Sequence, residues 1–402
     1  MGSPTENSRS VWTSRPSTGL PYDHLSGVMR IALVHSYYRS ETPSGENVAV
    51  DRQAELLAAA GHEVRIVARH SDEDASRSSD KLRLAWQVAS GAGADPSAEL
   101  RAFNPDVVHV HNLFPNFGTR WLKTWPGPLL ATVHNYRPLC ANALLLREGK
   151  FCTLCPDGDK WAGVRHSCYR ESRAATIPLA IRNRPGPSRD ALLHRADRII
   201  MLSPRAETIY RRYGLPSEKL RQLPHGIDAA AADSPTEPLN RWVSVGRLTS
   251  EKGWAWLVAN WPADVGLDIY GAGPMRAELA ASAPASVRLL GEVSNDVLRA
   301  QLPRYQGAIF AGVAPEGCPF SAIEALAAGL PLIARRDGAA ADMVERWGCG
   351  SIFRDGHQMS ECLHQPTTPA DREAALLTFR DNFTTEAWLS GLLAIYRELV
   401  TS

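Results

Sequence analysis

Short apolar runs alternate with helical patterns along the first half of the chain. Buried parallel strands are expected at residues 31–34, 64–68, 106–110, 129–133 and 198–202. Between the first two runs, residues 46–60 have apolar positions at helical spacing and stop at Gly61. Strands that alternate with helices indicate a doubly wound α/β sheet.

The same alternation begins again after residue 240. Strands are expected at residues 241–245, 267–270, 287–290, 308–310 and 331–334, with helices between them. Residues 229–240 are rich in alanine and contain two prolines, which is typical of a linker. The sequence therefore predicts two α/β units, 29–228 and 241–383, joined by 229–240.

The N-terminal residues 1–28 are polar, rich in Ser, Thr and Pro, and lack periodicity. They contain no apolar run of the kind that a secretory signal needs. We expect a disordered leader, and Met29, where the first strand begins, is an alternative start of the protein.

Composition narrows the function classes. The chain of 402 residues has 44 Lys and Arg against 43 Asp and Glu, a net charge of +1, which argues against a strongly basic nucleic-acid-binding protein. Its 44% of apolar residues is ordinary for a folded protein, and no apolar run approaches the roughly 18 residues of a membrane span.

Histidines follow three of the expected strands in the first half. His35, His111 and His134 stand at carboxyl ends of strands, which is where α/β sheets bind ligands. Each could alone be a structural hydrogen-bonding group, but three together favour a site. Gly45 begins the first helix and would let an anion approach the backbone, although Ser44 could simply be an N-cap.

Phosphate-binding chemistry is concentrated in the second half. Arg247 and Lys252 follow its first strand, flanked by glycines, and Gly271 and Gly273 follow another strand in the same way. A diphosphate needs this combination of positive charge and close backbone approach.

Two carboxylates stand eight positions apart, Glu316 in a loop and Glu324 inside the helix that follows. Pro319 suits the first turn of this helix, and the helix N-terminus near Ser321 can face an anion. Carboxylates accept two hydrogen bonds from sugar diols. The alternative for either glutamate alone is a surface salt bridge.

These motifs together resemble the family 4 glycosyltransferases, retaining enzymes of the GT-B fold, over roughly residues 29–399. The resemblance is carried by residues 132–134, 224–228, 246–253, 271–274 and 316–331.

The resemblance implies two Rossmann-like domains that face a central cleft. Residues 29–228 would form the acceptor side, residues 241–383 would bind a nucleotide-sugar, and a helix in 384–402 would cross back to the first domain. The family often has paired glycines at the first loop, Asn in place of His225 and Gly in place of Pro319.

The resemblance also implies roles for single residues. Arg247 and Lys252 would hold the diphosphate, and Glu324 would hold the ribose. Glu316 would contact the transferred sugar beside His134. Donor-binding residues would include, in addition, Gly45, Gly271, Gly273 and Ser321.

A segment with four cysteines interrupts the first unit at residues 136–170. Cys140, Cys152, Cys155 and Cys168 have the spacing C-x11-C-x2-C-x12-C, and we expect them to hold one structural zinc. His166 could replace one sulfur, and free thiols or disulfides are the alternatives. The cysteines resemble those of a bacterial subgroup of the family that shares this insert.

Arginine is enriched next to this insert. Residues 165–212 contain 11 Arg, no Lys and four acidic residues. A solvated helical surface is the favoured interpretation, and a surface for a membrane or an anionic acceptor is the alternative.

The predicted function is transfer of a sugar, with retention, from a UDP- or GDP-sugar to a hydroxyl of a small or lipid-linked acceptor, in bacterial natural-product or cell-envelope biosynthesis. No metal is needed for catalysis, because two cations face the diphosphate. The expected location is the cytoplasm, with contact at the inner membrane face as an option, and no nucleic acid partner is expected. A sugar-nucleotide epimerase, a non-catalytic binder and a two-carboxylate glycosidase are the alternatives.

Overall fold

The computed structural model describes residues 27–37, 45–71, 78–229 and 237–401. The predicted leader therefore lies almost wholly outside the described residues, as do Ser44 and most of the predicted linker. The described chain divides into two compact units. The first combines residues up to 132 with 191–199 and 393–402, and the second combines 133–190 with 200–392. The domain boundaries expected from the sequence stay predictions.

The first sheet has six strands in the order β2-β1-β3-β4-β7-β8. Its strands are β1 (Arg30–Tyr37), β2 (Glu63–His70), β3 (Val107–Asn112), β4 (Leu129–Val133), β7 (Arg198–Met201) and β8 (Leu220–Gln222). β1 pairs in parallel with β2 and β3, and β3 with β4. The five expected strands are confirmed, and β8, which has only three residues, was not predicted.

Helices α1 to α7 follow these strands. They are α1 (Gly45–Ala59), α2 (Ser78–Ser90), α3 (Ser97–Phe103), α4 (Ala162–Arg165), α5 (Arg173–Asn183), α6 (Ala191–Arg195) and α7 (Pro204–Arg212). The predicted helix at 46–60 is α1. Ser203 caps α7 by accepting a hydrogen bond from the Ala206 amide, and Pro204 fills the first helical position, where no amide hydrogen is needed.

The second sheet also has six parallel strands, in the order β11-β10-β9-β12-β13-β14. They are β9 (Arg241–Val245), β10 (Gly266–Tyr270), β11 (Val287–Gly291), β12 (Ala308–Phe310), β13 (Leu332–Arg335) and β14 (Gly350–Phe353). All five expected strands are present, and the edge strand β14, partly exposed and beginning with Gly350, was missed.

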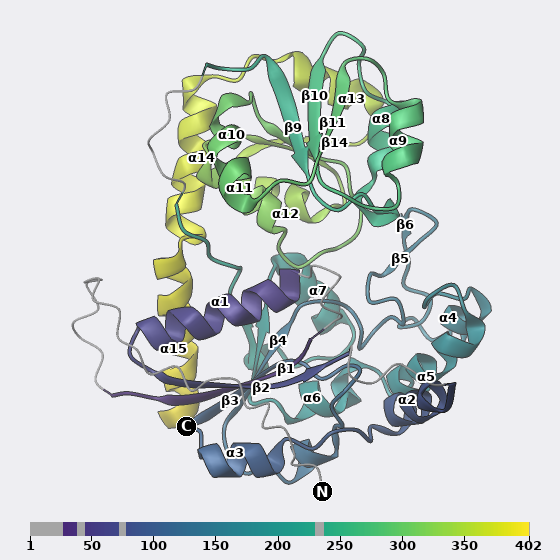
Figure 1. The fold of residues 1–402 in the computed structure, drawn as a ribbon, viewed down its shortest axis with the longest axis vertical. Coiled ribbons are helices and arrows are strands. Elements are labelled where there is room, and N and C mark those ends of the chain that lie inside the picture. The colour runs from purple at the N-terminus through teal and green to yellow at the C-terminus, as the bar shows by residue number, and fades with distance from the viewer. Residues whose placement is uncertain (1–26, 38–44, 72–77, 230–236, 402) are drawn as a thin grey trace, which may run out of the picture. The chain divides into compact units, whose positions relative to one another are not determined.

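Helices cover both faces of this sheet. They are α8 (Trp254–Ala259), α9 (Arg276–Ser282), α10 (Asn295–Gln301), α11 (Phe320–Ala327), α12 (Ala339–Trp347), α13 (Gly356–His364) and α14 (Pro369–Asn382). The last helix, α15 (Thr385–Thr401), belongs to the first unit from residue 393 onward. Figure 1 shows α8 and α9 on one side of the sheet and α10 and α11 on the other. Two apolar clusters correspond to these two layers. The described part of the chain contains no helix that is long and apolar enough to cross a membrane.

The core of the first unit explains the uninterrupted apolar run of its first strand. Ile31, Ala32, Leu33 and Val34 of β1 are completely buried, as expected for a parallel strand covered on both faces.

A buried hydrogen-bond network ties the end of the chain to this core. The Tyr396 hydroxyl of α15 lies 2.8 Å from His109 Nδ1, and Gln53 Nε2 of α1 lies 2.9 Å from the same nitrogen. His109 Nε2 lies 2.7 Å from Thr132 Oγ1. Burial lowers the pKa of His109 to about 3, so the imidazole is neutral at physiological pH.

This network predicts that the protein loses stability in mild acid. The unfolded chain binds a proton at His109 below about pH 6.5, whereas the folded chain does not until about pH 3. At pH 5 the free energy of unfolding should therefore have fallen by about 2 kcal/mol through this residue. Urea unfolding at pH 7 and pH 5 measures the loss, which should be smaller by about 2 kcal/mol in His109→Gln.

The matched control is His357→Gln, which changes an exposed imidazole on α13. It should keep the pH dependence of the parent chain. An unaltered pH dependence in His109→Gln would show that the buried imidazole is not the group responsible.

Candidate active site

The loop after β9 directs a lysine toward a glutamate in the second unit. Lys252 ends the short 3-10 turn Ser250–Lys252, and Gly253 follows in the left-handed conformation at φ 76°. A Cβ on Gly253 would lie 2.4 Å from the carbonyl oxygen of Ala311, so only glycine fits this position. The Lys252 Nζ lies 2.7 and 2.8 Å from the two carboxylate oxygens of Glu316.

This ion pair lies at a pocket that opens to solvent. Lys252, Glu316 and Ser321 all line the pocket, and Ser321 is the second residue of α11. About a quarter of each charged side chain remains exposed, so a ligand can reach the pair. The pocket thus combines a cation, a carboxylate and a helix N-terminus, which suits an anion that carries hydroxyl groups.

Arg247 stands apart from this group. Its side chain is 59% exposed and lies 3.6 Å from Glu251, and it does not line the pocket. Its carbonyl oxygen accepts a hydrogen bond of 2.7 Å from the Trp254 indole, which fixes the backbone of the loop. The guanidinium itself can therefore move toward a ligand without disturbing the loop.

The glycines at 271 and 273 pack two loops together. A Cβ at Gly271 would lie 2.0 Å from the carbonyl oxygen of Gly246, and one at Gly273 would lie 2.5 Å from that of Leu248. The Leu248 amide donates to Ala272 across the same contact at 2.8 Å. Neither glycine lines the pocket, and their predicted contact with the donor stays a prediction.

Glu324 lies one turn inside α11 and away from the pocket lining. Its side chain is 10% exposed, and burial raises its pKa, whereas Arg299 at 3.8 Å opposes this shift. Pro319 was expected in the first turn of the helix but occupies the N-cap position with extended backbone angles, so the helix begins at Phe320.

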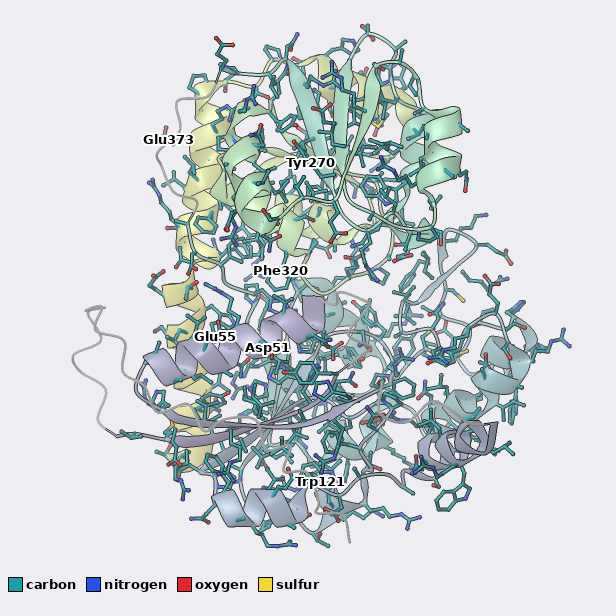
Figure 2. All side chains as sticks on the ribbon, viewed as in Figure 1. Asp51, Glu55, Trp121, Tyr270, Phe320 and Glu373 are labelled. Carbon is teal, nitrogen blue, oxygen red and sulfur yellow. The ribbon has the colours of Figure 1, made fainter. Side chains whose placement is uncertain are left out.

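Three aromatic rings, not predicted as a group, stack beside this helix. The ring of His225 lies between those of His134, at 5.9 Å, and Phe320, at 4.5 Å, with interplanar angles of 20° and 15°. Burial lowers the pKa of His225 to about 4, so this ring is neutral. Figure 2 labels Phe320 at the beginning of α11. In the sequence, His225 belongs to the motif at 224–228 that carries the family resemblance, but the resemblance implied no role for this histidine.

Gly45 and His35, two other residues singled out in the first half of the sequence, both belong to the first unit. Gly45 is exposed at the first position of α1. His35 Nε2 lies 3.0 Å from Asn47 Oδ1, and burial lowers the pKa of His35 to about 4. This histidine is thus a buried structural group, which was the alternative to a site residue.

The predicted zinc site is not supported. Cys140, Cys152, Cys155 and Cys168 line one small pocket together with His166. Among the described residues, however, no three His, Cys, Asp or Glu side chains are placed to hold a metal ion. Cys140 instead lies 2.9 Å from the side-chain oxygen of Asn142, and all seven cysteines are free thiols, as in one of the alternatives.

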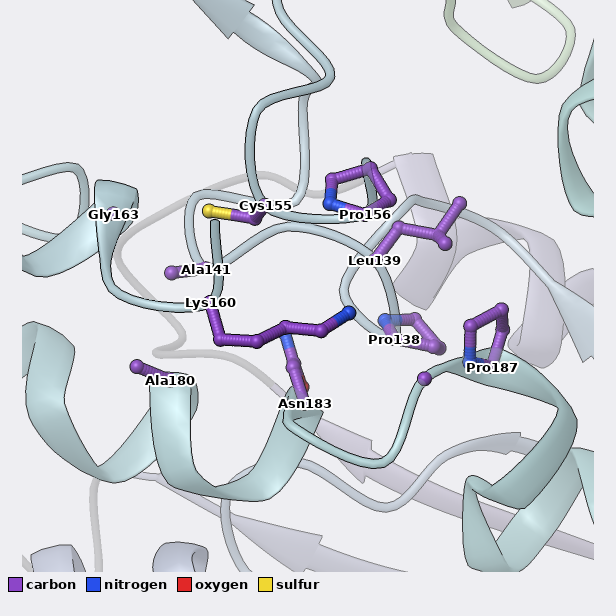
Figure 3. A pocket seen from close by; sticks show the side chains of 11 residues that line it. Pro138, Leu139, Ala141, Cys155, Pro156, Lys160, Gly163, Ala180, Asn183 and Pro187 are labelled. Atoms are coloured by element: carbon purple, nitrogen blue, oxygen red, sulfur yellow. The ribbon is translucent and has the colours of Figure 1, made fainter. Parts of the chain in front are cut away.

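A second pocket, lined by the insert and by residues between 180 and 187, is almost entirely apolar. Cys155 and Lys160 contribute to it with Pro138, Pro156 and Pro187, and Lys160 is the charged residue among the side chains that Figure 3 draws. Its lining is unlike that of a diphosphate site.

Two family models match most of the chain. Residues 43–231 match the model described as Glycosyltransferase Family 4, and residues 240–365 match the model described as Glycosyl transferases group 1. No curated protein matches the chain.

Solved structures share the fold at low sequence identity. Sucrose-phosphate synthase of Thermosynechococcus elongatus is 19% identical with a TM-score of 0.62, and the match covers 93% of this chain and 99% of that one. WaaG, a glycosyltransferase involved in lipopolysaccharide biosynthesis, is 16% identical with a TM-score of 0.61 over 92% and 99%. HepE of Anabaena, solved with UDP and glucose, is 16% identical with a TM-score of 0.56 over 93% and 100%.

These matches agree with the two parallel-sheet units and with the predicted fold class. The chain is therefore a glycosyltransferase of the GT-B fold, in which a family 4 domain is followed by a group 1 domain.

Proposed function

We propose that the chain transfers a sugar, with retention of configuration, from a nucleoside-diphosphate sugar to an acceptor hydroxyl. The observation that carries this proposal is the Lys252–Glu316 ion pair, which shares one pocket with Ser321 at the start of α11. A diphosphate competes with the carboxylate for the ammonium group, and the freed carboxylate can accept hydrogen bonds from the sugar.

The reaction needs stabilisation of the departing diphosphate. The bond from the anomeric carbon to the phosphate oxygen breaks, and the acceptor oxygen forms its bond on the same face of the sugar. The acceptor proton passes to the phosphate oxygen that leaves. Lys252 and the N-terminus of α11 neutralise the charge that develops on this oxygen, so catalysis requires no metal.

Further residues complete the donor site in this proposal. Arg247, whose side chain is exposed, turns to the diphosphate, and Glu324 accepts hydrogen bonds from the ribose. His134 stands beside the sugar in its ring stack with His225. Gly45, Gly271 and Gly273 allow close approach of the backbone.

The donor is a UDP- or GDP-sugar, and HepE, which shares the fold, has been solved with UDP-glucose, UDP and glucose. The acceptor is a small molecule or a lipid-linked sugar in bacterial natural-product or cell-envelope biosynthesis. All seven cysteines are free, which is typical of proteins in a reducing compartment and supports a cytoplasmic location. The proposal includes membership of a bacterial subgroup of family 4 that shares the cysteine insert.

The decisive experiment measures turnover of a panel of UDP-, GDP-, ADP- and dTDP-sugars with and without candidate acceptors, together with thermal shifts. The true donor should raise the melting temperature and release its nucleoside diphosphate when an acceptor is present. Retention is then tested by NMR of the new glycosidic bond. A donor that is epimerised without an acceptor, or bound without any turnover, would refute glycosyl transfer.

Loss of the ammonium group should disable the chemical step. We expect Lys252→Ala to lower turnover by at least about 100-fold, the scale for removing a group that stabilises developing charge. Arg247→Ala should have a comparable effect if its exposed guanidinium reaches the diphosphate. Arg336→Ala, which removes an exposed cation paired with Glu345, is the control and should keep normal turnover. Near-normal turnover in Lys252→Ala would contradict the assignment.

Substitution of the two glutamates should change different kinetic quantities. Glu324→Gln weakens contact with the ribose in ground and transition states alike, so it should raise the dissociation constant of the donor. Glu316→Gln removes a contact to the sugar whose charge develops during transfer, so it should mainly lower kcat. Calorimetry with donor and steady-state kinetics separate the two effects. Equal losses of donor affinity in both variants would refute the division of roles.

A further inference from the structure

Helix α5 presents two isoleucines to solvent. Ile177 and Ile181 are 40% and 44% exposed, whereas Thr176, Leu179 and Ala180 of the same helix are buried. Because positions four apart lie on one side of a helix, the two isoleucines form a single apolar stripe.

Exposed apolar side chains are concentrated in this part of the chain. Among the described residues, 13 large apolar side chains are exposed, and five of them lie between residues 151 and 181. They are Phe151, Leu154, Trp161, Ile177 and Ile181. Single exposed apolar residues are normal, but such a concentration marks an interaction surface.

Arginines extend the stripe at both ends. Arg173 lies one turn before Ile177, and Arg184 follows Ile181 by three positions, so both continue the same side of the helix. Arg170 and Arg189 flank the segment, and all four arginines are exposed. We call Arg170, Arg173, Ile177, Ile181, Arg184 and Arg189 the α5 face.

These four arginines differ from the other seven of the arginine-rich stretch. Arg165, Arg182, Arg195, Arg198, Arg205, Arg211 and Arg212 each pair with an acidic side chain. In the part of the chain that the structure describes, no acid pairs with any arginine of the α5 face. The acids adjacent to these arginines in the sequence are Glu171, which is exposed, and Asp190, which pairs with Arg182. The four arginines therefore face solvent with one exposed acid, Glu171, next to them in the sequence.

We propose that the α5 face docks on an anionic lipid bilayer. The isoleucines would enter the headgroup region, and the arginines would bind lipid phosphates, which the planar guanidinium matches with two hydrogen bonds. An apolar stripe between cations fits this occupant better than a nucleic acid, because a phosphate backbone offers isoleucine nothing to bury against. The proposal concerns lipid binding and holds whatever the donor sugar is.

Sedimentation of the full-length chain with vesicles tests the proposal. Phosphatidylcholine vesicles with about a third of phosphatidylglycerol are compared with pure phosphatidylcholine vesicles at about 0.1 M and 0.5 M salt. The chain should bind the anionic vesicles at low salt, bind them weakly at high salt, and not sediment with the neutral vesicles.

Two double variants separate charge from apolar contact. Arg173→Gln/Arg184→Gln should weaken binding about 25-fold, because each arginine near an anionic surface contributes about fivefold. Ile177→Ser/Ile181→Ser should weaken binding by at least about 10-fold, because it removes two apolar side chains that would be buried in the headgroup region. Circular dichroism and melting temperature show whether each variant is folded.

Matched control substitutions lie in residues 241–392, which form the second six-stranded sheet and its helices. Arg288→Gln/Arg354→Gln removes two exposed arginines, and Leu377→Ser removes an apolar side chain that is 48% exposed on α14. Both should bind anionic vesicles as the parent chain does.

Several results would overturn the proposal. These are equal binding to both kinds of vesicle, binding to neither, or equal loss in control and α5-face variants. A parent dimer in light scattering that becomes monomeric in the isoleucine variant, with vesicle binding unchanged, would instead identify the α5 face as an interface between copies of the chain.

Discussion

A parallel sheet that is covered by helices on both faces has few positions where a polar side chain can reach a ligand. Its strands must be buried along nearly their whole length, as β1 is, and its helices must turn one side inward. Polar side chains that must stay open to a ligand can then gather only where strands end and loops begin. Lys252 follows β9 and Glu316 follows β12, two strands that are neighbours in the second sheet, and this adjacency brings their charges within 2.7 Å.

The ion pair also explains how charged side chains can line the pocket when no ligand neutralises them. A lysine held at a helix N-terminus by itself would face an unfavourable partial positive charge, and a partner carboxylate offsets it. The pair is only partly buried, so separating it in favour of a diphosphate costs little compared with a fully buried pair. Glu324 differs because burial raises its pKa, whereas the positive charge of Arg299 favours the ionised carboxylate.

Sequence patterns predicted most of this arrangement because they report burial and backbone conformation. Ten strands were located from apolar runs, whereas β8 and β14 were missed because a strand of three or four partly exposed residues carries no such run. The same patterns brought Lys252, Glu316 and Ser321 to one site but could not give side-chain direction. Arg247 therefore lies outside the pocket, despite its equivalent place in the motif.

The cysteine insert shows why the spacing of cysteines was not enough to predict a zinc site. Zinc was expected because a long segment with few regular elements needs something to offset its ordering entropy. The structure supplies hydrogen bonds from side chains to backbone for this purpose. Asn142 donates to the Leu146 carbonyl at 2.8 Å, Asn183 to that of Arg137 at 2.6 Å, and Arg137 to that of Ala141 at 2.9 Å. Asn183 ends α5, so these bonds also anchor the buried side of that helix and leave its opposite side, with the isoleucines, free to face a partner.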